Sequence, residues 1–196
     1  MLTKRGSIII AALSAIFCLL SVAYVSCTKV GSSPACNGVV CLNNGYCKAG
    51  RCKCPSGFEG SNCGTAAVAK YFGTWDVRQT VIGSDSSYKV GQDSVYTVFL
   101  KKTATPTTFF IDNFMGNASY NDLLCTLDTL NSRNFGLDTL RDLNMWYEHV
   151  TIRRGSYGTI TNNDTLINAF VVIKFVNTTH NFQVDTLRMI MTPHHF

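Results

Sequence analysis

The chain has 196 residues, of which 46% are hydrophobic and 15% are charged, and its formal net charge is +5. This length and composition suffice for one independent hydrophobic core. The charge is small, and the basic pairs Lys101-Lys102 and Arg153-Arg154 fit solvated strand positions, so nucleic acid is not an expected partner.

The N-terminal segment has the pattern of a secretory signal peptide. Lys4 and Arg5 precede an apolar run over residues 8–25, which is followed by small residues and a cysteine. The run is shorter than the ~20 residues that a membrane-spanning helix needs, so we expect it to be cleaved. Loss of the two basic residues lowers the net charge from +5 to +3.

Two cleavage sites fit this segment. Ser21-Val22-Ala23 has the small-x-small form, which predicts a cut after Ala23. Val25-Ser26-Cys27 resembles the lipobox of bacterial lipoproteins, which implies a signal peptide over residues 1–26 and a lipid on the Cys27 sulfur. Each buried CH₂ of an acyl chain contributes about 0.8 kcal/mol of membrane affinity, so the lipidated protein would be held firmly by membrane lipid.

The next segment, residues 27–35, contains Gly, Ser and Pro and is expected to be a flexible tether. Of the nine cysteines, Cys18 would leave with the signal peptide and Cys27 would carry the lipid. Cys125 lies in an apolar segment, where a free thiol behaves as a small buried hydrophobe. If the cut falls after Ala23, Cys27 and Cys125 could pair instead.

The remaining six cysteines are close together in the sequence and predict a disulfide framework in an oxidising compartment. A zinc site is the alternative, but Cys-x-Cys is not the usual zinc spacing, so we expect no metal. The spacing alone leaves the pairing open. These cysteines are Cys36, Cys41, Cys47, Cys52, Cys54 and Cys63.

Gly45, the pair Gly57-Phe58 and Gly60 accompany this spacing, and residues 36–63 resemble an EGF-like module. Calcium-binding modules of that family carry acidic and amide residues before the first cysteine. Residues 31–35 contain none, so no calcium is expected. The resemblance implies three disulfides, Cys36 with Cys47, Cys41 with Cys52, and Cys54 with Cys63.

A linker over residues 64–70 is expected to lead into the main domain, residues 71–196. This domain is rich in β-branched and aromatic runs, which predict an all-β fold with eight antiparallel strands in a β-barrel or a β-sandwich. The turn residues Gly155-Ser156 and Asn162-Asn163 predict two tight hairpins. The expected strands are 71–80, 94–102, 107–114, 123–130, 143–154, 157–161, 165–176 and 182–192.

At the start of this domain, Phe72-Gly73-Thr74-Trp75 resembles the Gly-x-Trp motif of lipocalins, in which the tryptophan plugs the closed end of the barrel. That resemblance implies a carrier of a small apolar ligand as one alternative. Core packing is the simpler interpretation of Trp75 and Trp146. The order of lipobox, tether, module and β-domain also looks like Gram-negative outer-membrane lipoproteins, and Thr28 after the lipidated cysteine favours the outer membrane, facing either the cell surface or the periplasm.

Motifs of catalysis are missing: the chain has no Gly-x-Ser-x-Gly, no His-Glu-x-x-His and no phosphate-binding glycine loop. A hydrolytic enzyme of the cell envelope would have to rely on groups such as Asp112, Glu148 or His149. We therefore expect a non-enzymatic lipoprotein without a cofactor. Its β-domain would bind a protein, a glycan or a small apolar ligand, or serve a structural role, and no ligand-binding residue can be named.

The tripeptide Asp-Thr-Leu occurs at four places in the β-domain. Some bacteria O-glycosylate such sites. The alternative is that Asp ends a turn and Thr-Leu begins a strand, which suits turn chemistry and β-propensity. The candidate hydroxyl groups are those of Thr129, Thr139, Thr165 and Thr186.

Overall fold

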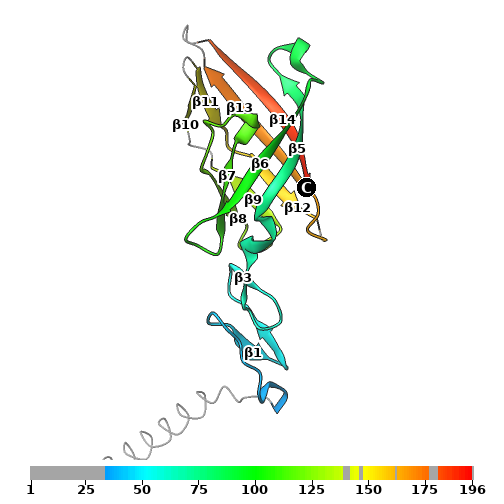
Figure 1. Cartoon of the computed structure of the whole chain (residues 1–196). Coiled ribbons are helices and arrows are strands. Elements are labelled where there is room, and N and C mark those ends of the chain that lie inside the picture. The colour runs from blue at the N-terminus through cyan, green and yellow to red at the C-terminus, as the bar shows by residue number, and fades with distance from the viewer. Residues whose placement is uncertain (1–33, 139–141, 146–147, 162, 177–180, 196) are drawn as a thin grey trace, which may run out of the picture.

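A computed structural model describes residues 34–138, 142–145, 148–161, 163–176 and 181–195 (Figure 1). The expected signal peptide, Cys27 and Thr139 lie outside these residues. Within the described ranges, no helix has both the length and the hydropathy needed to cross a membrane.

Residues 34–66, which we call the disulfide module, lie at one end of the molecule (Figure 1). Ala49 and Gly50 have φ values of 50° and 79°, the conformation of a type I′ turn, and they join the first two strands. The described elements are η1 (Pro34–Cys36), β1 (Tyr46–Lys48), β2 (Arg51–Lys53), β3 (Phe58–Glu59) and β4 (Thr65–Ala66). They form two small antiparallel sheets, β1 with β2 and β3 with β4.

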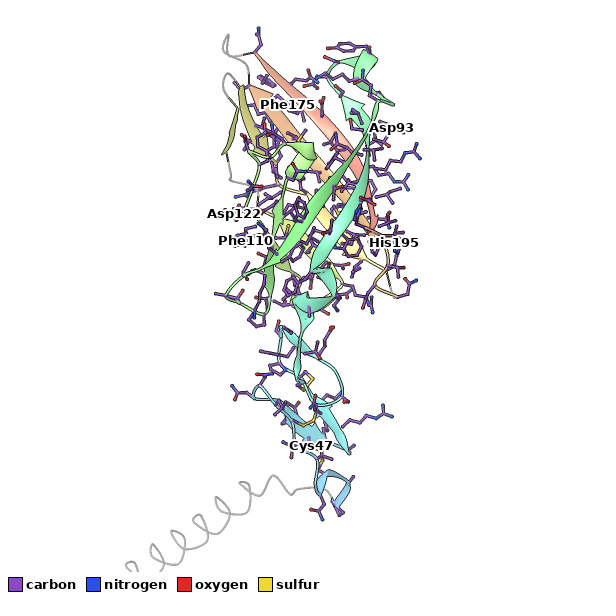
Figure 2. All side chains as sticks on the ribbon, in the orientation of Figure 1. Cys47, Asp93, Phe110, Asp122, Phe175 and His195 are labelled. Atoms are coloured by element: carbon purple, nitrogen blue, oxygen red, sulfur yellow. A yellow bond between two sulfur atoms is a disulfide. The ribbon has the colours of Figure 1, made fainter. Side chains whose placement is uncertain are left out.

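Three disulfides hold this module together (Figure 2). Cys63 is the one hydrophobic residue of the module whose side chain is buried, so the module has almost no apolar interior. Cross-links therefore replace a core in this small unit. The bonds join Cys36 to Cys47, Cys41 to Cys52 and Cys54 to Cys63, which is the pairing that the EGF-like resemblance implies.

Beyond the module, the described residues form a closed antiparallel barrel of eight strands. Consecutive barrel strands pair with each other, and β14 pairs with β5 to complete the ring. The strands are β5 (Gly73–Ser84), β6 (Asp93–Lys102), β7 (Thr108–Asp112), β8 (Leu123–Leu127), β9 (Asn134–Leu137), β12 (Tyr157–Ile160), β13 (Ile167–Val176) and β14 (Phe182–Pro193).

Two further strands lengthen one side of the barrel. β10 (Asp142–Met145) pairs with β11 (Glu148–Ile152) in the same register in which β9 pairs with β12. β9 and β10 therefore lie end to end at one position in the sheet, and β11 and β12 lie end to end at the neighbouring position. Because β11 also pairs with β13, these segments belong to the same up-and-down arrangement. The all-β prediction is confirmed, and of its two alternatives the structure is the barrel.

The structure differs from the predicted strands in two places. Strand β9 was not expected, and the single strand expected over residues 143–154 is instead a hairpin of β10 and β11. The hairpin expected at Gly155-Ser156 is also wrong. Both β11 and β12 pair with β13, so these residues form a bulge in which Ser156 Oγ accepts the Val172 N–H at 3.0 Å.

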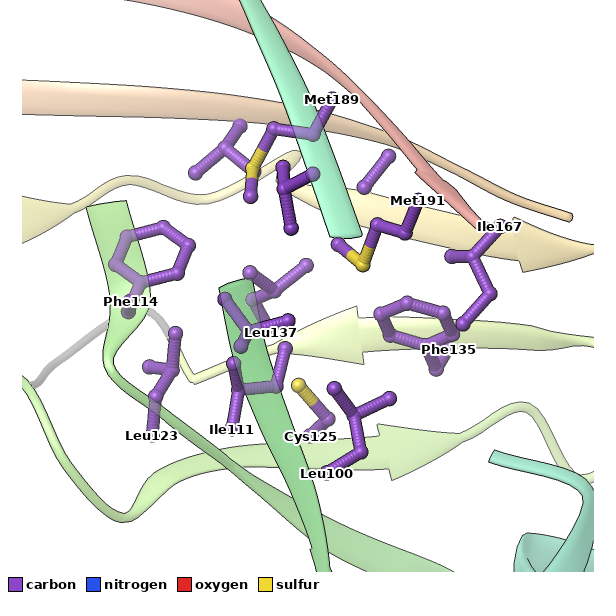
Figure 3. Close-up of a cluster of buried hydrophobic side chains, with 14 of the residues drawn as sticks. Leu100, Ile111, Phe114, Leu123, Cys125, Phe135, Leu137, Ile167, Met189 and Met191 are labelled. Carbon is purple, nitrogen blue, oxygen red and sulfur yellow. The ribbon is translucent and has the colours of Figure 1, made fainter. Parts of the chain in front are cut away.

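The barrel interior is filled by apolar side chains that alternate along the strands (Figure 3). At the end next to the disulfide module, Tyr71 stacks on Phe109 with ring centroids 4.8 Å apart, and Phe135 packs edge-on against both rings. Trp75 is buried at this end, and its indole N–H donates to the Tyr71 carbonyl at 2.8 Å. Phe114, in η4 (Phe114–Gly116), contributes to the interior from the β7–β8 connection.

Residues 64–70, expected as a linker, join the two parts through ordered structure. They form β4 and most of the short helix η2 (Ala67–Tyr71), in which Ala67 and Val68 are buried in the barrel core. The Ala67 N–H donates to the Gly57 carbonyl at 2.8 Å. A Cβ atom at Gly57 would lie only 2.8 Å from Thr107 Cγ2, so the Gly57 backbone of the module lies close against the Thr107 side chain.

A partly buried ion pair spans the same junction, with the lysine as its buried member. Lys70 Nζ lies 2.6 Å from Glu59 Oε2, and the exposed fractions of the two side chains are 6% and 36%. Ser132, in the β8–β9 connection, has its hydroxyl 3.3 Å from the same ammonium, and its carbonyl accepts the Tyr71 hydroxyl at 3.0 Å. The junction therefore holds the module in a defined position on the barrel.

We expect Glu59→Gln to lower the free energy of unfolding by about 2 kcal/mol, because it leaves the Lys70 ammonium buried without its carboxylate. The double variant Glu59→Gln/Lys70→Met should recover most of this loss, since both charges are then removed. Urea denaturation of the single and double variants measures the coupling.

Asp93→Asn, which breaks the exposed pair of Arg78 and Asp93, is the matched control and should cost well under 1 kcal/mol. Equal losses for Glu59→Gln and Asp93→Asn would contradict the buried-pair interpretation.

Candidate functional site

A pocket of about 450 Å³ opens at the end of the barrel opposite the disulfide module. It lies between the β5–β6 connection, residues 85–92, and the adjoining ends of β13 and β14 (Figure 1). Its volume falls in the range of small-molecule sites. The lining residues are Asp85, Ser86, Lys89, Phe175, Asn181, Phe182 and Gln183.

Local hydrogen bonds place the β5–β6 connection over this end of the barrel. Asp85 is bound to Val184 of β14 twice, through its own N–H at 3.2 Å and through Oδ2, which accepts the Val184 N–H at 2.9 Å. Ser84 Oγ accepts the Ser86 N–H at 3.0 Å, and the Lys89 N–H donates to the Ser86 carbonyl at 3.0 Å to close η3 (Ser87–Lys89). The connection is thereby fixed on β14 with Lys89 beside the pocket.

A buried carboxylate, that of Asp185, lies behind this pocket: it contacts the lining residues Lys89 and Gln183 but does not itself line the space. Asp185 lies on β14 opposite Ile173 and Ser84, with 4% of its surface exposed, and faces the barrel interior. Its Oδ1 accepts the Ser84 hydroxyl and the Gln183 side-chain amide, both at 2.6 Å. These two hydrogen bonds offset part of the free-energy cost of burying the Asp185 carboxylate.

The other oxygen of Asp185 faces a lysine. Lys89 Nζ lies 3.7 Å from Oδ2 and 5.6 Å from the centre of the Phe175 ring. A second lysine has the same relation to a second ring, because Lys174 Nζ lies 4.7 Å from the centre of the exposed Phe182 ring. The pocket thus combines one carboxylate, two amides, two aromatic rings and an ammonium group, which suits the binding of a polar molecule.

The groups named for catalysis do not form this pocket. Asp112 is buried on the outer side of the barrel, where it forms an ion pair with Lys101 and accepts the Asp122 N–H at 2.8 Å. The hydrogen bond from Lys101 to Asp112 and the negative charge of this carboxylate raise the pKa of Lys101. Glu148 and His149 lie in β11, and their side chains fall outside the described part of the chain.

The Asp-Thr-Leu sites differ in their surroundings. Thr129 is exposed in the β8–β9 connection, where Asp128 Oδ1 accepts the Leu130 N–H at 2.7 Å. Thr165 is exposed in the β12–β13 connection. Thr186 lies within β14, half-buried between partner strands. The turn interpretation fits Asp164, which lies in the turn that precedes β13. It is wrong at Asp128, which begins a turn after β8 with Thr129 and Leu130 outside any strand, and at Asp185, which is a buried strand residue.

Sequence reasoning did not find the pocket. Its residues come from the β5–β6 connection and from β13 and β14, and the Ser84–Asp185 hydrogen bond joins residues 101 positions apart. One signal was present: Asp185 precedes Leu187, Met189 and Met191 at alternate positions, which places a carboxylate in a series of interior residues. A scan against models of protein families finds no match for the chain, and a search of curated proteins also finds none.

Proposed function

We propose that the protein is a non-enzymatic lipoprotein of the bacterial outer membrane that binds a small polar ligand in the pocket of its barrel. The observation that carries the proposal is the order of the parts along the molecule. Pro34, the first described residue, is at the far end of the disulfide module, and the pocket is at the opposite end of the barrel (Figure 1). A lipid on Cys27 would therefore direct the pocket away from the membrane.

The junction between module and barrel supports this arrangement. The pair of Lys70 and Glu59, the hydrogen bond from Ala67 to Gly57 and the close approach of Gly57 to Thr107 all restrict motion of one part against the other. A module with three disulfides and almost no core is suited to serve as a spacer. The module would then set the distance between membrane and pocket.

The side chains that line the pocket favour a polar ligand over an apolar one. Most of the described interior positions of the barrel hold apolar side chains that pack against each other (Figure 3). The polar exceptions, Gln79 and Asp185, are hydrogen-bonded to Tyr96 and Gln183. The pocket at its end is lined instead by charged and amide groups around two rings. A lipocalin-like carrier would need apolar walls around its ligand.

The anchor is tested by fractionating cells that express the full chain and the variant Cys27→Ser. We expect the full chain in the membrane fraction, with an N-terminal peptide that begins at Cys27 and carries acyl mass, and the variant in the soluble fraction. Cys125→Ala is the control, because its buried thiol should not affect anchoring. A mature chain that begins after Ala23 and contains a Cys27–Cys125 disulfide would overturn the proposal.

If the Asp-Thr-Leu sites are glycosylated, we expect hexose mass on peptides containing Thr129 and Thr165 but none at Thr186. The first two hydroxyls lie in exposed connections, whereas the backbone at Thr186 pairs with strands on both sides. A transferase that reads the tripeptide needs access to the chain around the hydroxyl. Mass spectrometry of native peptides measures this, with Thr129→Ala and Thr165→Ala as controls. Modification at Thr186 with bare Thr129 would contradict the accessibility argument.

A further inference from the structure

We infer that the pocket recognises its ligand through a primary ammonium group, which takes the position held in this structure by Lys89 Nζ. This inference rests on the proposed binding function of the same pocket. It concerns the chemical class of the ligand and the role of the lysine that lies at the mouth.

The first argument is the unequal use of the two Asp185 oxygens. Oδ1 has two short hydrogen bonds, from Ser84 and Gln183, each of 2.6 Å. Oδ2 contacts Lys89 Nζ at 3.7 Å, and among the described residues no closer partner is seen for it. A charge-assisted hydrogen bond between ammonium and carboxylate has a length of about 2.7 to 2.9 Å. Oδ2 can therefore accept a closer cation than the one it now faces.

The second argument is the position of the Phe175 ring. Lys89 Nζ is 5.6 Å from its centre, near the outer limit of about 6 Å for an attractive contact between a cation and an aromatic face. A carboxylate together with a ring face is a recognised arrangement for binding ammonium groups. Both contacts of Lys89 are long, and 29% of its side chain is exposed, so the lysine occupies the position loosely.

The third argument is charge. With Lys89 displaced, the carboxylate of Asp85 lines the pocket, and that of Asp185 lies behind the position that the Lys89 ammonium has left. Two carboxylates in a partly enclosed site attract a cation and disfavour an anion. The side chains of Asn181 and Gln183 line the same space, and the Gln183 amide donates to Asp185 Oδ1 from the edge of the pocket.

Lys89 would then act as an internal competitor. A site that its own side chain occupies binds a ligand with an affinity reduced by the fraction of the time for which the site is open. Removing the competing ammonium should therefore strengthen binding, whereas removing the Asp185 charge should weaken it. A structural ion pair alone would give no gain in affinity when Lys89 is changed.

The test uses the mature full chain and two probes of equal length, 1,4-diaminobutane and the uncharged 1,4-butanediol. Binding is measured by calorimetry and by the NMR shift of the Gln183 side-chain amide. We expect Lys89→Met to bind the diamine about tenfold more tightly than the unmodified chain, with no gain for the diol. Lys174→Met, which changes the lysine over Phe182, is the matched control and should show no gain.

A gain in affinity cannot come from misfolding, so Lys89→Met remains decisive even if Asp185→Asn proves unstable. Asp185→Asn, where it folds, should lose at least about tenfold in diamine affinity. If the diol binds as well as the diamine and Lys89→Met changes neither, the ammonium inference is wrong and the proposed polar-ligand function stands. If neither probe shifts the Gln183 amide in any variant, both the inference and the proposed use of this pocket fail.

Discussion

Gly158→Ala is expected to lower the free energy of unfolding of the barrel by about 3 kcal/mol, at the upper end of the usual cost of overpacking. Gly158 lies on β12 directly opposite Phe135 of β9. A Cβ atom at this position would lie 2.1 Å from Phe135 Cζ and within 2.7 Å of both Cε atoms. The ring cannot simply move away, because it packs against Tyr71 and Phe109 at centroid distances of 5.4 and 5.1 Å.

Gly136→Ala provides the matched control. Gly136 lies on β9, beside Phe135, but a Cβ there would meet no heavy atom within 4 Å. We expect a change of at most about 0.5 kcal/mol for this variant. Urea denaturation followed by tryptophan fluorescence measures both, since Trp75 is buried in the barrel. Adding Phe135→Leu to Gly158→Ala should restore part of the loss, and equal stability of the two alanine variants would refute the packing argument.

Replacing Cys54 and Cys63 together with alanine is expected to unfold the disulfide module and to leave the barrel folded. Removing a disulfide from a small domain costs about 2 to 5 kcal/mol. Cys63 is fully buried, and the module has no other hydrophobic side chain in the buried core that could make up this loss. The barrel has its own core and closed hydrogen bonding, so it should persist.

The two parts can be followed separately in this variant. Limited proteolysis reports the module through cleavage between residues 34 and 66. The barrel is reported by Cys125, whose thiol is buried and whose pKa is raised by burial, so a thiol reagent should not label it while the barrel is folded. Cys125→Ala is the control for the labelling. Rapid labelling of Cys125 in the double alanine variant would mean that module and barrel unfold as one unit.

These variants also separate stability from binding. Gly158 and the cysteines are far from the pocket, whereas Lys89 and Lys174 lie at its mouth or beside its rings. A change in ligand affinity at Lys89 without a comparable change in unfolding therefore reports the pocket itself. The pair of Glu59 and Lys70 tests a third property, the coupling between module and barrel.

The sequence by itself determined the all-β class and the positions of most strands, because alternation of apolar and polar side chains is a local property. The six clustered cysteines likewise determined that the first unit depends on cross-links, since so short a segment cannot bury a core. Turn chemistry was read correctly at Asp164, which lies in the turn before β13 with a φ of 57°. Each of these conclusions depends on neighbours within a few residues.

Only the tertiary structure decided the rest. Closure into a barrel rather than a sandwich depends on the pairing of β5 with β14, which lie at opposite ends of the domain. The four residues of β9 are a strand because β8 and β12 pair with them on both sides, and Gly155-Ser156 form a bulge because β13 continues past them. The pocket likewise exists because barrel closure brings Lys89 next to Asp185. The pairing of strands far apart in the sequence determines the neighbours of each side chain, and a local pattern of residues does not specify which strands pair.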